Sequence, residues 1–380
     1  MKVAILKERE VDEARVAASP ETIRKLAGLG FDAHVETGAG ASASFPDAAF
    51  SDAGATIGKT LTATLANADV IFKVRPPSNT ELQAMPRGAL LAGLLAPYDA
   101  TRDLERYASA GITTFALELL PRISRAQSMD VLSSQSNLAG YRAVIDAAAE
   151  FGRALPMMMT AAGTVAPARV LVMGAGVAGL QAIATARRLG AIVSATDVRP
   201  AAREQVESLG ASFVMVEDDE AAAAETAGGY AREMSDDYQR QQRALIAETM
   251  TRQDIVICTA LVPGRRAPQL IDEAMVRSMR PGSVIVDLAV ESGGNCAMAV
   301  AGTTVDAGGV RIVGHLNMPG RVAVDASAMY ARNLLNFITP LVDTEVGALD
   351  IDWEDEIIRS TCVTRDGVIV HPQFLVREAS

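Results

Sequence analysis

The sequence contains few of the residues that would indicate a secreted or metal-dependent protein. Its 380 residues include three cysteines, three histidines and one tryptophan, and aromatic residues make up only 4%. Cys258, Cys296 and Cys362 are far apart and match no CxxC or zinc-ligand spacing. We therefore expect neither disulfides nor a bound metal, and this cysteine usage favours the reducing cytoplasm.

Long apolar runs and an excess of positive charge are also missing. No apolar run approaches the roughly 20 residues of a membrane-spanning helix, and Gly88–Tyr98 is better interpreted as a buried strand with its turn. The N-terminus MKVAILKERE lacks the apolar region of a signal peptide, so we expect a cytoplasmic protein without a membrane span. A formal charge of −11 makes nucleic acid and anionic membrane surfaces poor partners.

Apolar residues are abundant, at 49%, and their pattern predicts an α/β fold. Short apolar runs alternate with helical patterns, and the helix after Ser19 has a capping serine followed by Pro20. We expect two Rossmann-like domains, each a mostly parallel sheet flanked by helices, with a cleft between them. Residues 1–132 and 315–380 are assigned to a discontinuous N-terminal-type domain, and residues 133–314 to an NAD-binding Rossmann domain. The predicted strands are residues 2–6, 31–36, 69–74, 88–93, 112–117, 169–173, 191–197, 254–260, 283–290 and 310–314, and further helices are expected at 137–153 and 326–338.

The strongest chemical motif is a glycine fingerprint. Gly174, Gly176 and Gly179 follow the apolar run RVLVM, precede an amphipathic helix, and are followed 18 residues later by Asp197 at the end of another strand. In this pattern the first glycine permits a tight turn, the second admits a pyrophosphate, and the third lets the helix pack closely. Asp197 would accept hydrogen bonds from a ribose and favour NAD over NADP, a preference that Arg199 weakens. The alternative is a glycine-rich turn without a ligand.

Three further polar segments follow predicted strands. Cys258–Gly264 and Glu291–Asn295 lie where ligands bind in open α/β sheets, although both also suit ordinary strand-to-helix turns. Pro121–Val144 is rich in Arg, Gln and Ser, and we interpret its beginning as a loop before the helix at 137–153. Such a loop either keeps itself solvated or holds a small polar ligand.

These residues resemble the NAD(H)-binding domain I, the first segment of the alpha subunit, of proton-translocating NAD(P) transhydrogenase, within the alanine dehydrogenase/transhydrogenase family. The resemblance covers essentially the whole chain. It is carried by RISRAQSMD, SSQSNLAGYRAVIDAA, PMMMTAAGT, GVAGLQAIATARRLGA, ETAGGYAREM, VDLAVESGGNC, NLLNF and TCVTRDGVIVHP.

The resemblance implies roles for the loop at 121–133. Arg122 and Asp130 should pair to hold its shape, Gln127 should contact the nicotinamide ribose, and Ser133 should steady the carboxamide; these four residues form the implied catalytic set. Ile123, Ser124 and Arg125 are further implied contacts, although Ser124, Ser128 and Ser136 by themselves suit a solvated loop. The other implied NAD(H) contacts are Gly174, Gly176, Val177, Ala178, Gly179, Asp197, Val198, Arg199, Gly229, Tyr230, Thr259, Ala260, Leu261 and Glu291. Tyr230 lies in a segment that resembles the family's mobile lid.

Alanine dehydrogenase is the principal alternative, because it shares the two-domain plan. That enzyme needs an acid/base histidine and cations for the substrate carboxylate. Arg15 and Lys73 stand where the family places the cations, but the histidine position corresponds to Leu94 and the aspartate position to Glu291. We interpret His34 and His315 as structural, and His371 is uninformative.

The expected function is that of the Si-specific, proton-translocating transhydrogenase. The chain has one glycine fingerprint, so it would bind NAD(H) and donate hydride to NADP(H) bound to a separate domain III subunit. Membrane subunits would couple this transfer to proton translocation, and the chain would be a homodimer, peripheral to the inner membrane on its cytoplasmic side. The remaining alternatives are an alanine dehydrogenase-like enzyme and a non-catalytic NAD(H)-sensing module.

Overall fold

The computed structural model describes residues 1–98, 101–216, 235–262 and 264–375. The chain divides into two compact units: unit 1 contains residues 1–135 and 320–380, and unit 2 contains residues 136–319. Both are mostly parallel sheets flanked by helices, so the predicted α/β class is confirmed. Within the described ranges, the structure contains no helix long and apolar enough to span a membrane.

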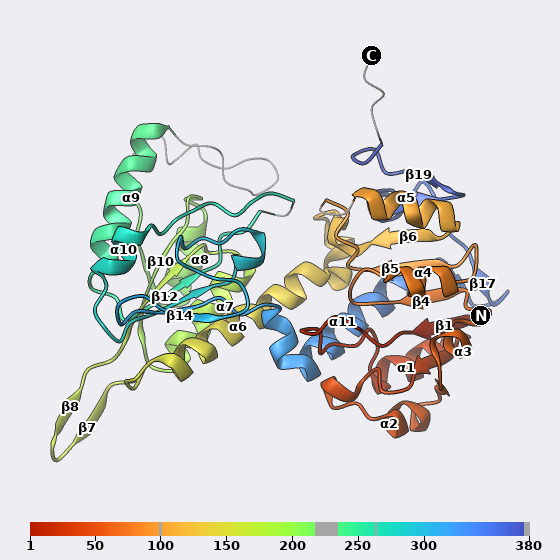
Figure 1. The fold of residues 1–380 in the computed structure, drawn as a ribbon, viewed down its shortest axis with the longest axis horizontal. Helices are drawn as coiled ribbons and strands as arrows, with labels where there is room; N and C mark the ends of the chain where they lie inside the picture. The colour runs from red at the N-terminus through yellow and green to blue at the C-terminus, as the bar shows by residue number, and fades with distance from the viewer. Residues whose placement is uncertain (99–100, 217–234, 263, 376–380) are drawn as a thin grey trace. The chain divides into compact units, whose positions relative to one another are not determined.

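Unit 1 is built on an eight-stranded sheet with the order β19-β18-β6-β5-β4-β1-β2-β3 (Figure 1). The strands from β1 to β6 are parallel, whereas β18 and β19 are antiparallel additions at one edge. The strands are β1 Lys2–Ile5, β2 Asp32–Glu36, β3 Thr56–Gly58, β4 Val70–Phe72, β5 Leu90–Gly93, β6 Thr113–Ala116, β18 Cys362–Arg365 and β19 Val368–Ile369. The helices are α1 Pro20–Gly28, α2 Asp47–Asp52, α3 Leu61–Leu65, α4 Asn79–Ala84, α5 Thr101–Ala110, α11 Ala323–Ile338 and α12 Glu356–Thr361.

Alternation along the strands of unit 1 divides its apolar residues between two cores. Val3 and Ile5 face a core shared with α1, α2, α11 and α12, whereas Ala4 faces a core shared with α3, α4 and α5. The predicted start of α1 is confirmed, because the Ser19 side chain accepts a hydrogen bond from the backbone N–H of Thr22.

Unit 2 is built on a seven-stranded sheet with the order β11-β10-β9-β12-β13-β15-β14. Only β14 is antiparallel to its neighbour. One apolar core packs this sheet against α6, α7 and α8, and the other packs its opposite face against α9 and α10 (Figure 1). The strands are β9 Arg169–Met173, β10 Ile192–Thr196, β11 Ser212–Phe213, β12 Ile255–Cys258, β13 Val284–Asp287, β14 Thr304–Asp306 and β15 Arg311–Val313. The helices are α6 Val131–Glu150, whose first residues belong to unit 1, α7 Val177–Arg188, α8 Ala202–Ser208, α9 Asp236–Met250 and α10 Glu273–Ser278.

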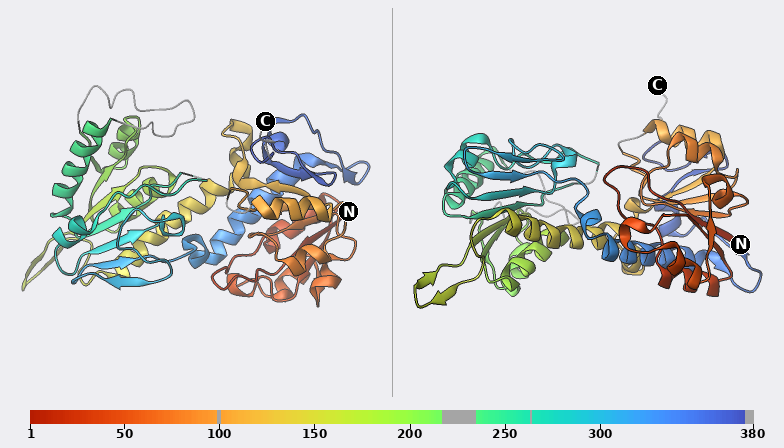
Figure 2. Two further views of the ribbon diagram at one scale, coloured as in Figure 1. Left: turned by 45° about the horizontal axis from the view of Figure 1, so that its top comes forward. Right: turned by 60° about the horizontal axis from the view of Figure 1, so that its bottom comes forward.

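Two features were not predicted from the sequence. A two-stranded ribbon of β7 (Met158–Thr160) and β8 (Gly163–Val165) extends away from the sheet of unit 2 (Figure 2). The helix expected from about residue 137 begins at Val131 instead, so the polar loop is shorter than the sequence indicated. Serines and asparagines are weak helix formers, which is why the pattern of SSQSN did not predict this first turn.

Candidate functional site

The glycine fingerprint forms the turn between β9 and α7. Gly174 has a φ of 98°, which favours glycine, and a Cβ on Gly179 would lie 1.8 Å from the carbonyl oxygen of Gly174. By contrast, a Cβ on Gly176 would meet no other atom within 4 Å. Two of these glycines are therefore required by the fold, while Gly176 leaves open space in front of the turn.

The N-terminus of α7 is open to solvent on this side. Its N-cap residue is Gly176, so no side chain accepts the first N–H groups of the helix, and Val177 is 40% exposed. Uncapped N–H groups at the start of a twelve-residue helix favour a bound anion. Gly140 of α6 contributes to this geometry without having been predicted, because a Cβ there would lie 2.0 Å from the carbonyl oxygen of Ala178.

Asp197 follows β10 directly and points its carboxylate at the glycine turn. Its Oδ2 accepts a hydrogen bond of 2.7 Å from the backbone N–H of Ala175. Burial acts to raise the pKa of Asp197, but hydrogen bonds from the side chain of Arg199 and from the backbone of Ala175 and Arg199 outweigh it and lower the pKa. The Asp197 carboxylate is therefore ionised at neutral pH, and Val198 beside it is 36% exposed.

The segment after β12 lies next to the glycine turn, where the strand order of unit 2 reverses. The Thr259 hydroxyl donates to the carbonyl oxygen of Gly174 at 2.9 Å, and Leu261 is 48% exposed. Asn295 holds this segment: its Nδ2 donates to the Ala260 carbonyl at 2.9 Å, and its Oδ1 accepts from the Ala260 N–H at 3.1 Å. The sequence indicated the ESGGN segment but not this role of its buried asparagine.

Glu291 lies on a short 3-10 turn after β13, Val290–Ser292, and is exposed. Its Oε2 accepts a hydrogen bond of 3.3 Å from the backbone N–H of Asn317. The turn is held from below by Asp287, whose carboxylate accepts backbone N–H groups of Ala289 and Asn295. Glu291 thus remains at the carboxyl edge of the sheet, as the sequence predicted.

The polar loop of unit 1 follows β6 and contains the 3-10 turn Ser124–Met129. Ala126 and Met129 are buried in the core below it. Two asparagines of α11, Asn333 and Asn336, each donate from Nδ2 to the Ser128 carbonyl at 2.9 Å. This loop is therefore anchored to its unit rather than merely solvated.

Gln127 is presented on the outer side of this anchored turn. It is exposed, and within the described ranges its amide makes no hydrogen bond to protein. Arg122 and Ser124 are also exposed, and Ile123 is half-buried. The arrangement leaves the amide of Gln127 available to a ligand.

Asp130 and Arg125 have partners in unit 1 that the sequence did not indicate. Asp130 accepts hydrogen bonds from the backbone N–H of Ser133 at 2.9 Å and from its hydroxyl at 2.5 Å, so it caps α6. Arg125 forms an ion pair with Asp355 of its own unit. A capping carboxylate satisfies helix N–H groups locally, which gives Asp130 a role in the helix as well as the expected one beside Arg122. The pairing of Arg122 with Asp130 stays a prediction.

The two cations expected of an alanine dehydrogenase are buried and already paired. Arg15 is 3% exposed and donates from Nε and Nη2 to the Glu13 carboxylate at 2.7 and 2.6 Å. Lys73 is 1% exposed, with Nζ 3.1 Å from Glu8 and 3.0 Å from Glu81. Both cations are therefore neutralised by carboxylates of the chain itself.

The three histidines are also engaged in local contacts. His34 lies 2.9 Å from Asp32, His315 Nδ1 lies 2.8 Å from Asp146 on α6, and His371 lies 3.1 Å from the Ser360 carbonyl. Leu94, which replaces the acid/base histidine, packs against the core of unit 1.

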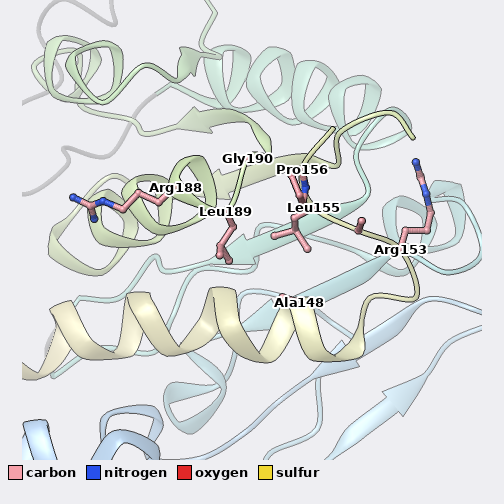
Figure 3. A pocket seen from close by; sticks show the side chains of 8 residues that line it. Ala148, Arg153, Leu155, Pro156, Arg188, Leu189 and Gly190 are labelled. Carbon is pink, nitrogen blue, oxygen red and sulfur yellow. The ribbon is translucent and has the colours of Figure 1, made fainter. Parts of the chain in front are cut away.

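Two regions of the surface complete the description of the predicted residues. Gly229 and Tyr230 lie outside the described residues. A hollow of about 480 Å³ opens where α6 and α7 end, and Arg153, Leu155, Pro156, Arg188 and Leu189 are among its lining residues (Figure 3). It contains none of the predicted cofactor contacts, because it lies at the amino edge of the sheet, where β10 begins.

The order of the strands, the glycine turn and Asp197 together define a nucleotide-binding protein of the Rossmann-like class. Sequence profiles of two domains match the chain: "Alanine dehydrogenase/PNT, N-terminal domain" over residues 4–139 and "Alanine dehydrogenase/PNT, C-terminal domain" over residues 143–372. The chain belongs to the alanine dehydrogenase/PNT family.

Individual relatives narrow this assignment. Over 377 residues, which cover 98% of each chain, it is 57% identical to the Rhodospirillum rubrum protein named as the first part of NAD(P) transhydrogenase subunit alpha. It superposes on the crystal structure of a transhydrogenase from Sinorhizobium meliloti with a TM-score of 0.89 and 55% identity, covering 97% of this chain and 100% of the other. An L-alanine dehydrogenase structure gives a TM-score of 0.82 with 27% identity and covers 98% of each chain. The fold is thus common to both enzymes, and the sequence is closer to the transhydrogenase.

Proposed function

We propose that this chain is the NAD(H)-binding subunit of a proton-translocating transhydrogenase, of the Si-specific type. It would transfer hydride directly from NADH to NADP⁺ bound to a partner subunit. The observation that carries this proposal is a glycine turn with an uncapped helix N-terminus, in a chain 57% identical to an alpha-subunit protein of a transhydrogenase.

The site residues suit a dinucleotide. The N–H groups of Val177 and Ala178 would hold the pyrophosphate in the space in front of Gly176, and Asp197 would accept the adenosine ribose. The exposed amide of Gln127 would contact the nicotinamide ribose, and Ser133 would steady the carboxamide. When bound, the dinucleotide supplies the hydride at C4 of its reduced ring.

Hydride transfer between two nicotinamide rings asks little acid/base chemistry of the protein, since no oxygen or nitrogen is protonated. The protein must bring the two rings together and exclude water. This requirement fits the residues in unit 1, where Leu94 replaces a histidine and the cations Arg15 and Lys73 are neutralised by buried glutamates. An amino-acid carboxylate would have to displace one of these buried carboxylates.

The proposal extends to the assembly. The NADP(H) would be bound to a separate domain III subunit, because the chain has one glycine fingerprint. Membrane subunits would couple the reaction to proton movement, with this chain as a cytoplasmic homodimer peripheral to the inner membrane. Gly229 and Tyr230 would belong to a lid over the nucleotide.

Mixing the purified chain with the NADP(H)-binding subunit of a transhydrogenase tests the proposal. We expect NADH-dependent reduction of NADP⁺ that requires both components. Alanine-dependent reduction of NAD⁺ by the chain alone would replace the proposal with an alanine dehydrogenase. Tight NADH binding without turnover with either partner would indicate a sensing module instead.

A further inference from the structure

The carboxylate of Asp197 is saturated with hydrogen-bond donors. Its Oδ1 accepts from the backbone N–H of Arg199 at 2.8 Å and from Nε of the same residue at 2.9 Å. Its Oδ2 accepts from the backbone N–H of Ala175 at 2.7 Å and from Nη2 of Arg199 at 2.9 Å. A carboxylate offers about four lone-pair positions, so a ribose would meet an acceptor that is already fully used.

The four donors are not equally fixed. The two backbone N–H groups belong to the glycine turn and to the turn after β10, which define the fold locally. The other two donors belong to one guanidinium, whose side chain is 25% exposed. The side chain of Arg199 is therefore the part of this arrangement that can move without unfolding the turn.

The guanidinium presents two parallel N–H donors to the two carboxylate oxygens. A ribose 2′,3′-diol presents two O–H donors with a similar side-by-side geometry. Binding a ribose with a free 2′-hydroxyl therefore exchanges two donors for two others and leaves the Asp197 carboxylate satisfied. A 2′-phosphate brings no such donor pair, and it places negative charge next to the carboxylate.

We propose that Arg199 is a specificity-determining residue, whose guanidinium occupies the ribose-diol position on Asp197 and is displaced by the ribose of NAD(H). This inference rests on the proposed function, because it takes Asp197 as the ribose acceptor. The displaced cation stays beside the ribose and softens the repulsion of a 2′-phosphate. Arg199 thus weakens NADH binding by competition and strengthens NADPH binding by charge, so it narrows the preference of the site.

Substituting Arg199→Met tests this, because methionine keeps an apolar stem and removes the fork. We expect the dissociation constant for NADH to fall about threefold and that for NADPH to rise about tenfold, since the bare carboxylate accepts the diol without competition and repels the phosphate. Titration of the isolated chain with each nucleotide measures both constants. Arg199→Lys, which keeps the charge without the fork, should recover part of the NADPH binding.

Arg188→Met is the matched control, since it removes an exposed arginine of unit 2 from the far end of α7. An unchanged NADH/NADPH ratio in Arg199→Met overturns the inference. Equal weakening of both nucleotides together with a lower melting temperature assigns Arg199 a structural role and also overturns it. Absence of NADH binding in the unsubstituted chain would instead refute the proposed function.

Discussion

The two units have the same order of parallel strands but different chemistry at the carboxyl edge of the sheet. In unit 1 the order is β3-β2-β1-β4-β5-β6, and in unit 2 it is β11-β10-β9-β12-β13-β15. In unit 2 only Gly174–Gly176 separate β9 from α7, whereas residues 6–19 separate β1 from α1 in unit 1. The position that holds a glycine turn in one unit holds a long, charged segment in the other.

The starts of the two equivalent helices differ in the same way. Ser19 and Thr22 form a reciprocal capping box at α1, while α7 has glycine at its N-cap and no side-chain partner. An anion would have to displace Ser19 at α1 but finds free N–H groups at α7. The shared topology therefore does not create a nucleotide site; the residues between the first strand and its helix do.

The carboxyl edge of unit 1 is instead stabilised by buried ion pairs, with Lys73 between Glu8 and Glu81. We expect Lys73→Met to lower the free energy of unfolding by about 4 kcal/mol, because both carboxylates lose their buried cation. NADH affinity should not change, since the glycine turn belongs to unit 2. Urea unfolding and NADH titration check the two expectations.

Lys59→Met serves as the control for this substitution, because Lys59 is exposed. A loss of stability in Lys73→Met no larger than in the control would mean that the ion pairs do not hold the edge of unit 1.

Acid should also act on unit 1 through these pairs. Burial acts to raise the pKa of Glu13, but Arg15 and Arg75 outweigh it and lower the pKa from 4.5 to about 2. The stabilisation is therefore fully present above pH 4.5 and is lost as the pH falls towards about 2, a contribution of roughly 3 kcal/mol. Hydrogen exchange at low pH should show β1 and β4 losing protection within this window. The same pH dependence in Glu13→Gln would assign the effect to another carboxylate.

A pair of glycine substitutions separates folding from binding in unit 2. Gly179→Ala should lower the free energy of unfolding by about 2–3 kcal/mol, because its Cβ would collide with the Gly174 carbonyl. Gly176→Ser should leave stability almost unchanged and weaken NADH binding about tenfold, since a serine at the N-cap occupies the N–H groups of α7. Thermal unfolding and NADH titration of both variants measure these effects.

Gly176→Ala distinguishes the two ways in which the serine would act. Weakening by alanine as large as that by serine would show that space, rather than capping, governs the site.

The loop of unit 1 should affect turnover more than stability. Gln127→Asn withdraws the exposed amide by one methylene, so we expect NADH-to-NADP⁺ turnover to fall about tenfold with little change in NADH affinity. Stopped-flow turnover with the NADP(H)-binding subunit measures this, and Gln83→Asn on the exposed face of α4 is the control. Equal losses of turnover and NADH affinity would contradict the assigned role of Gln127.

Local patterns predicted much of this protein correctly. The Ser19 cap, the glycines of the β9–α7 turn, and the strands that lead to Asp197 and Thr259 follow from residues adjacent in the sequence. The first turn of α6 did not, because it depends on Asp130 capping Ser133 and on Ser134 contacting Asn333 of α11. Long-range contacts of this kind leave no periodic pattern in the chain.

The sequence by itself determined the two-domain α/β class and the place of the glycine fingerprint, because apolar periodicity and the backbone needs of glycine are local properties. Tertiary structure alone decided which polar residues are already occupied by the protein: Arg15 on Glu13, Lys73 on Glu8, and Arg199 on Asp197. Whether a charged side chain is free for a ligand depends on which partners the fold brings within hydrogen-bond distance. Composition and spacing do not encode that distance.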